Sequence, residues 1–130
     1  MKLLGGCRGA ESLEAAATIP VVAMLVFFLV QGGILVYNAQ ICQEAARHGA
    51  RMGSVAQVNP AAVAYAEASA YASRLMGSPS VTILAPGGVV GSELTVRVET
   101  DVPNVMGHLV PGMPSSIHVS GEATFRQEGW

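Results

Sequence analysis

The chain contains little charge and few of the residues from which catalytic or metal sites are built. Only 12% of its 130 residues are charged, and seven Lys and Arg against nine Asp and Glu give a formal net charge of −2. So few basic residues form no stripe that could bind nucleic acid, and a nucleic-acid partner is not expected. The two cysteines, Cys7 and Cys42, do not suggest a disulfide framework, and Cys42 is expected to be a small packing residue.

Catalytic motifs are also missing from the sequence. The three histidines, His48, His108 and His118, fall in three different expected elements, and no HExxH or CxxC motif accompanies them. Gly87-Gly88 follows an expected strand but opens no helix, so it is a poor cradle for phosphate. We therefore expect neither an enzyme nor a cofactor or metal ion.

One long apolar run is the dominant feature that the sequence does contain. From Ala15 to Val36 there are 22 residues without a charge. At about 1.5 Å per residue they form a helix of about 33 Å, enough to cross a hydrocarbon core of roughly 30 Å. The alternative is a buried core helix, which seldom carries an uninterrupted apolar stretch this long. Pro20 lies inside the run, where it is expected to kink a helix that a membrane tolerates.

Two other interpretations of the N-terminus are weaker. Glu11 and Glu14 stand directly before the apolar run, which strains a cleavable secretory signal. The string Leu4-Gly5-Gly6-Cys7 superficially resembles a lipobox, but only three residues precede it, so no apolar region is available to insert. Lys2 and Arg8 precede the run and give a slight bias towards an N-terminus on the inner side of the membrane.

The helical pattern continues beyond the apolar run. Residues of an expected apolar stripe recur at spacings of three and four, with polar residues on the other faces. The stripe is Ile34, Tyr37, Ile41, Ala45, His48 and Met52, and the polar residues are Asn38, Gln43, Glu44, Arg47 and Arg51. The first helix is therefore expected to run to about Met52, with Gly53 as its C-terminal stop. Its outer stripe needs a partner, either the rest of this chain or a neighbouring subunit.

A second helix is well delimited. Asn59 suits the N-cap, Pro60 suits the first helical position, and Gly77 followed by Pro79 ends the segment. The stretch 61–76 is rich in alanine, and small residues permit close approach between helices. We expect this helix to pack against the first one and not to form a binding surface.

From Ser80 onward the apolar pattern has a period of two, which predicts strands. The expected inward residues are Leu94, Val96 and Val98 in one strand and Ile117, Val119, Ala123 and Phe125 in another. A shorter strand near 81–84 is ended by Pro86-Gly87-Gly88, and residues 103–114 are expected to form a loop. The predicted fold is α+β: a long N-terminal transmembrane helix extended outside the membrane, a second helix, and a small antiparallel sheet packed on the helices.

The N-terminal segment resembles substrates of the prepilin peptidase. These carry a short basic leader, a glycine, and a glutamate at the fifth position after it, followed by a membrane-length helix; here these residues are Gly9 and Glu14. The segment Gly9 to Pro20 and the later Ala45-Ala46-Arg47-His48-Gly49-Ala50-Arg51 are similar to those of the TadE-like pseudopilins of tight-adherence (Flp, type IVc) pilus systems. The similarity extends more weakly over the C-terminal strands.

This resemblance implies a domain organisation and a role. Residues 1–9 would be a leader, 10–36 the transmembrane helix and 37–130 an extramembrane pilin-like domain. Cleavage after Gly9 would leave Ala10 as the new N-terminus, with Glu14 and Pro20 serving assembly and Arg47, Gly49 and Arg51 forming a motif after the span. Glycine at the cleavage site offers no side chain to obstruct a peptidase.

The implied protein is a structural pseudopilin or minor pilin. Its partners would be the prepilin peptidase, other pilus subunits, inner-membrane assembly components and membrane lipid, with oligomerisation through the N-terminal helix. It would reside in the bacterial inner membrane with its C-terminal domain in the periplasm, and in an extracellular pilus after assembly. The alternative is an unprocessed single-pass anchor presenting a small periplasmic binding domain, and the N-terminus of the mature protein discriminates between the two.

Overall fold

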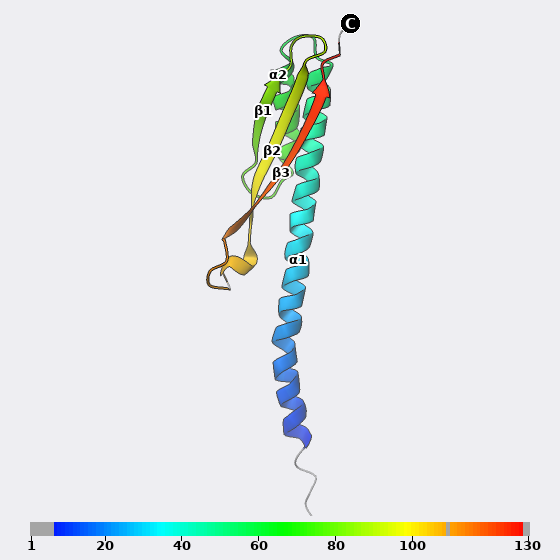
Figure 1. Cartoon of the computed structure of the whole chain (residues 1–130). Coiled ribbons are helices and arrows are strands. Elements are labelled where there is room, and N and C mark those ends of the chain that lie inside the picture. Colours follow the sequence, from blue (N-terminus) through cyan, green and yellow to red (C-terminus); the bar gives the residue numbers. More distant parts are fainter. Residues whose placement is uncertain (1–6, 109, 129–130) are drawn as a thin grey trace, which may run out of the picture. The chain divides into compact units, whose positions relative to one another are not determined.

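The computed structural model describes residues 7–108 and 110–128 of the chain. In chain order its elements are α1 (Cys7–Ser54), α2 (Pro60–Ala72), β1 (Ser80–Pro86), β2 (Glu93–Pro103), the 3-10 helix η1 (Val105–His108) and β3 (Ser116–Arg126) (Figure 1). The predicted α+β fold is confirmed. The chain divides into two compact units, residues 1–33 and residues 34–130, and α1 contributes to both.

The first unit consists of the N-terminal part of α1. Helical structure continues through Pro20 without a break. Among the described residues, α1 is the one helix long and apolar enough to cross a membrane, with a mean hydropathy of 2.5 over its most apolar window. Only 6% of that window is buried. A helix of this length and composition is compatible with anchoring in a membrane.

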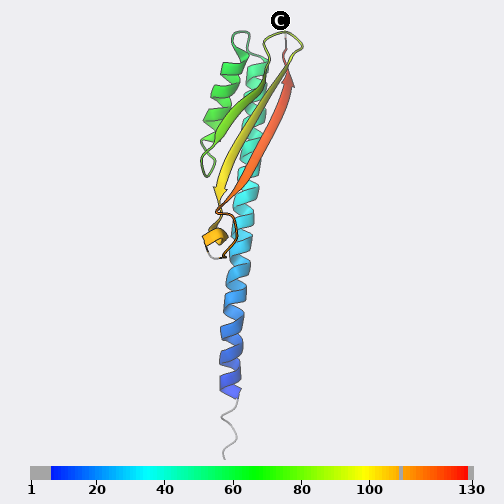
Figure 2. The ribbon, with the colours of Figure 1, turned by 60° about the vertical axis from the view of Figure 1, so that its left-hand side comes forward.

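The core of the second unit lies between the C-terminal part of α1, α2 and the inner face of the sheet (Figure 2). Its helical side chains are small, whereas those of the sheet are larger. They are Ile41, Cys42, Ala45, Ala46 and Ala50 on α1, Ala64, Ala68 and Ala72 on α2, and Leu94, Val96 and Val98 on β2. The expected packing of the alanine-rich helix against the first helix is thus confirmed.

Glycines set how closely α1 and α2 approach. A Cβ atom added at Gly49 would lie 2.6 Å from Ala68 Cβ and 2.7 Å from the Ala64 carbonyl oxygen. At Gly53 it would lie 2.7 Å from Ala64 Cβ. Carbon atoms normally approach to about 3.5–4.0 Å, so neither position has room for a side chain. Gly53, predicted as the helix stop, lies inside the last turn of α1, which ends one residue later at Ser54.

The predicted apolar stripe of α1 is only partly correct. Ile41 and Ala45 are buried, but Tyr37, His48 and Met52 are exposed, and Asn38, expected on a polar face, is fully buried. The close packing explains the difference. Since α2 lies almost against the α1 backbone, the small residues of α1 face it and the larger ones remain at the surface.

The second helix begins as predicted and ends early. The Asn59 side chain accepts a hydrogen bond from the Ala62 N–H, and Pro60 is the first helical residue. The helix ends at Ala72, four residues before the predicted end at Met76. The reason is a competing acceptor: the Met76 N–H donates to the buried Asn38 Oδ1 at 2.8 Å, and the Ala72 carbonyl accepts from Leu75 instead.

The sheet is antiparallel, as predicted, and its strand order is β1-β2-β3. The inward residues of β2 are fully buried, whereas Phe125 of β3, expected to face inward, is 37% exposed. β3 crosses α1 at Gly121, where an added Cβ would lie 2.5 Å from the Gln43 nitrogen. The predicted loop between β2 and β3 contains the short η1 helix.

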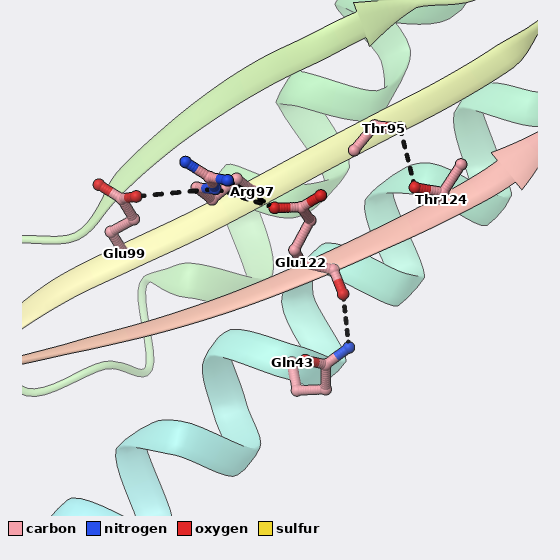
Figure 3. Close-up of polar contacts among 6 residues, drawn as sticks. All are labelled: Gln43, Thr95, Arg97, Glu99, Glu122 and Thr124. Atoms are coloured by element: carbon pink, nitrogen blue, oxygen red, sulfur yellow. Dashed lines mark hydrogen bonds and ion pairs between the residues drawn. The ribbon is translucent and has the colours of Figure 1, made fainter.

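The outer face of the sheet is polar (Figure 3). Arg97 lies between Glu122 at 2.7 Å and Glu99 at 3.9 Å, and the hydroxyls of Thr95 and Thr124 are 2.8 Å apart. Exposed ion pairs of this kind contribute little to stability. These contacts join β2 and β3 on the outer face of the sheet.

We predict that Gly49→Ala destabilises the second unit by about 1–3 kcal/mol, because the added methyl overpacks the contact with Ala68. Unfolding of the detergent-solubilised chain by urea, followed by circular dichroism, measures the change. Gly32→Ala is the matched control, since a Cβ there meets no atom within 4 Å. Equal stability of the two variants would show that α1 and α2 do not approach as described.

The buried thiol of Cys42 provides a pH test. Burial, followed in size by the charge of Glu99, raises the pKa of Cys42 above that of an ordinary thiol. The unfolded chain therefore ionises Cys42 at a lower pH than the folded chain does, and stability should fall as pH rises through the ordinary thiol range. Urea unfolding at a series of pH values should show this loss in the native chain and a smaller one in Cys42→Ala. An identical pH slope in both would place the thiol in water.

Candidate functional site

The largest exposed apolar surface among the described residues is on α1. Eleven large apolar side chains between Leu13 and Val30 are 46–74% exposed. They occupy every side of the helix, and most surface helices of soluble proteins are apolar on one stripe only. A helix that is apolar all round requires an apolar environment, either lipid or neighbouring apolar helices.

Glu14 lies at the N-terminal edge of this apolar surface and is itself exposed. Its backbone carbonyl oxygen accepts a 2.8 Å hydrogen bond from the Thr18 hydroxyl, so this hydroxyl has a partner within α1. Its carboxylate has no partner among the described side chains, which begin at residue 13. Gly9 and Ala10 belong to the first turns of α1, and both precede residue 13, where the description of side chains begins. Ala10 and Glu14 are thus one helical turn apart in the sequence of α1.

The sequence motif after the apolar run divides into two kinds of residue. Gly49 is buried under α2, where it permits the close approach of the helices. Arg47 and Arg51 are exposed, lie one turn apart on α1, and form no ion pair with any described residue. The motif therefore combines a packing position with two guanidinium groups that remain at the surface.

A polar network joins the exposed sides of α1 and α2. The Tyr71 hydroxyl donates to Glu44 at 2.9 Å, His48 lies 3.3 Å from Glu67, and the Arg74 guanidinium lies 4.6 Å from the centre of the Tyr71 ring. The hydrogen bond with Glu44 raises the pKa of Tyr71. In the part of the chain that the structure describes, no three His, Cys, Asp or Glu residues are grouped to hold a metal ion. The network is best explained as a set of structural contacts that hold α1 and α2 together.

Sequence reasoning missed two buried polar residues that organise the second unit. Asn38 donates to the Ile34 carbonyl and accepts from the Met76 N–H, both at 2.8 Å. Gln127 donates from its side chain to the Ala56 carbonyl at 3.0 Å, while its backbone N–H donates to the Ser92 carbonyl at 2.7 Å. No local pattern identifies such residues, because each has at least one partner that is distant in the sequence.

Comparison with known proteins shows a similarity of the N-terminal segment to one protein family. Residues 9–51, about a third of the chain, match the family model described as TadE-like protein. No curated protein and no solved structure matches the chain. The matched segment begins at Gly9, contains Glu14, Pro20 and the exposed apolar surface, and ends at Arg51. Over residues 9–51 the chain is therefore similar to TadE-like proteins.

Proposed function

We propose that this protein is a pseudopilin or minor pilin that acts structurally in the assembly of a type IVc (Tad) pilus for surface adherence. A prepilin peptidase removes residues 1–9, so that the mature chain begins at Ala10. Residues 10–36 hold the protein in the bacterial inner membrane, and residues 37–130 lie in the periplasm. After incorporation into a pilus the protein is extracellular.

One observation carries the proposal. The TadE-like segment, residues 9–51, contains the helix whose large apolar side chains are exposed on every side. A subunit whose apolar helix is not covered by its own chain can exchange lipid for neighbouring helices during assembly, since both environments are apolar. The segment also begins at the glycine where cleavage is expected, so one stretch of sequence supports both processing and assembly.

Glu14 is proposed to compensate the charge that processing creates. Cleavage after Gly9 leaves an α-ammonium group on Ala10, one helical turn before Glu14 in α1. An isolated charge at the edge of the hydrocarbon is costly, and pairing with an opposite charge offsets that cost. The ammonium can come from the same subunit or from a neighbour in the assembled pilus.

Arg47 and Arg51 are proposed to contact other pilus components. Both are exposed and lack an acidic partner among the described residues. Guanidinium groups bind carboxylates with two parallel hydrogen bonds, which gives direction as well as attraction. Acidic side chains of other pilus subunits or of the inner-membrane assembly components fit these two positions.

The processing step is tested at its peptide bond. In cells with the pilus machinery, trypsin digestion and mass spectrometry should give an N-terminal peptide from Ala10 to Arg47. The unprocessed chain gives a peptide that begins one residue earlier, because trypsin cuts after Arg8. Gly9→Val should abolish processing, because a branched side chain then stands at the scissile bond, and the peptide should begin at residue 9.

Gly6→Val is the matched control, since it places the same side chain in the leader away from the cleaved bond. It should mature normally. Normal maturation of Gly9→Val would exclude the proposed site. An intact Met1 in the native protein would support the unprocessed anchor, and an N-terminus beyond Val36 would support a secretory signal.

The role of Glu14 is tested by removing its charge. Glu14→Gln should insert into the membrane and lose its leader, yet co-purify poorly with other pilus components. The unpaired ammonium should cost several kcal/mol in the low-dielectric assembled state and much less in the lipid headgroup region. Glu14→Asp should restore part of the association, since the shorter side chain displaces the charge.

Glu11→Gln is the control for a general loss of negative charge near the start of α1. It should co-purify as the native protein does. Full co-purification of Glu14→Gln would reduce Glu14 to a residue that merely begins a helix.

A further inference from the structure

The two outer strands of the sheet differ in what lies beyond them. Beyond β3 lies α1, whose Gln43 side chain donates to the Glu122 carbonyl at 2.8 Å. Beyond β1, no described residue forms a hydrogen bond with the outer backbone groups of the strand. β1 is therefore an open edge of the sheet, and open edges are templates for pairing with another chain.

The register identifies which backbone groups of β1 are free. The Glu122 carbonyl of β3 points to α1, away from β2. In an antiparallel pair, its partner on β2, Arg97, therefore directs its backbone N–H and C=O groups away from β3 and towards β1. On β1 the residue paired with Arg97 is Thr82. Backbone directions alternate along a strand, so the N–H and C=O groups of Val81 and Ile83 point away from the sheet. The register shift between Ile83 and Ala85 limits the free edge to this short stretch.

A groove of about 360 Å³ lies beside this edge. It is bounded by α2 and by the start of β1, and its lining residues are Tyr65, Ser69, Ala72, Pro79, Ser80 and Val81. Tyr65 is 53% exposed, although it belongs to the helix that packs on the core. The Ser69 hydroxyl is buried and has no hydrogen-bond partner among the described residues. The groove thus offers an aromatic ring next to unused backbone groups.

The edge and the groove share one chemical property: neither contains a charge. No residue of β1, which runs from Ser80 to Pro86, and no residue lining the groove is ionisable at neutral pH. Sheet edges are commonly protected from pairing by lysine or other charged residues, and this edge has only its bulge and Pro86. A charged strand placed here would lose hydration without gaining an opposite charge, so the site favours a neutral one.

We propose that the open edge of β1 and the adjoining groove bind an extended, uncharged segment of a partner polypeptide by β-strand addition. The segment pairs with the backbone of Val81 and Ile83, and its alternate side chains enter the groove against Tyr65. This interaction is independent of leader removal and of the membrane helix.

The test uses the full-length protein in lipid nanodiscs and two capped, fluorescent five-residue peptides. One peptide alternates threonine and valine, and the other alternates threonine and lysine. Fluorescence anisotropy should show that the neutral peptide binds and that the charged peptide binds much more weakly. Hydrogen exchange resolved by NMR should show fast exchange at Val81 and Ile83 in the free protein and protection when the neutral peptide is bound.

Two variants and a control locate the binding. Tyr65→Ala should weaken binding by roughly tenfold, the loss expected for one aromatic contact at a site of this kind. Ile83→Pro should abolish binding, because proline lacks the N–H that points outward. Tyr37→Ala is the control, since Tyr37 is similarly exposed, at 48%, but does not line the groove.

Three outcomes would overturn the proposal. The first is equal binding of the two peptides, and the second is a Tyr65→Ala affinity equal to that of Tyr37→Ala. The third is slow exchange of the Val81 and Ile83 amides without peptide, together with a dimer in analytical ultracentrifugation. In that case the occupant of the edge would be a second copy of this chain.

Discussion

The structure depends first on an apolar helix whose large side chains are exposed. The eleven large side chains exposed between Leu13 and Val30 would each gain about 1.5–3 kcal/mol on burial. Together they represent a gain of the order of 20 kcal/mol, which exceeds the 5–15 kcal/mol that stabilises a typical domain. The helix is compatible with membrane anchoring, in which lipid or neighbouring apolar helices would surround these side chains.

The packing of the second unit depends on the small residues that α1 carries beyond the apolar surface. From residue 34 onward its buried face carries alanine, cysteine and glycine, so α2 and β3 approach its backbone directly. Such small side chains bury little area each, and the buried Asn38 adds two hydrogen bonds that fix where the chain leaves α2. The same stretch of helix thus supports a folded unit of its own, and its larger residues, including Tyr37, Arg47 and Arg51, remain at the surface.

Much of this fold could be predicted from the sequence because its signals are local. Asn59 with Pro60 determines where α2 begins, the alternation around Val96 predicts β2, and the uncharged run predicts the membrane helix. No local pattern indicates that α1 buries Asn38 instead of Tyr37, because the choice depends on the close approach of α2. For the same reason, the open edge of β1 became apparent only when α1 was seen to cover the opposite edge, at Glu122.

The central claim is that the apolar surface of α1 lies in the hydrocarbon of a membrane. Its most direct test is electron paramagnetic resonance of nitroxides attached at residues 24 and 40, in a chain whose native cysteines are replaced and which is reconstituted in lipid vesicles. Met24 belongs to the exposed apolar surface, whereas Gln40 is an exposed polar residue of the second unit. The nitroxide at 24 should collide with oxygen and not with a water-soluble nickel complex, and the nitroxide at 40 should show the reverse. Equal access of the nickel complex to both positions would contradict the account.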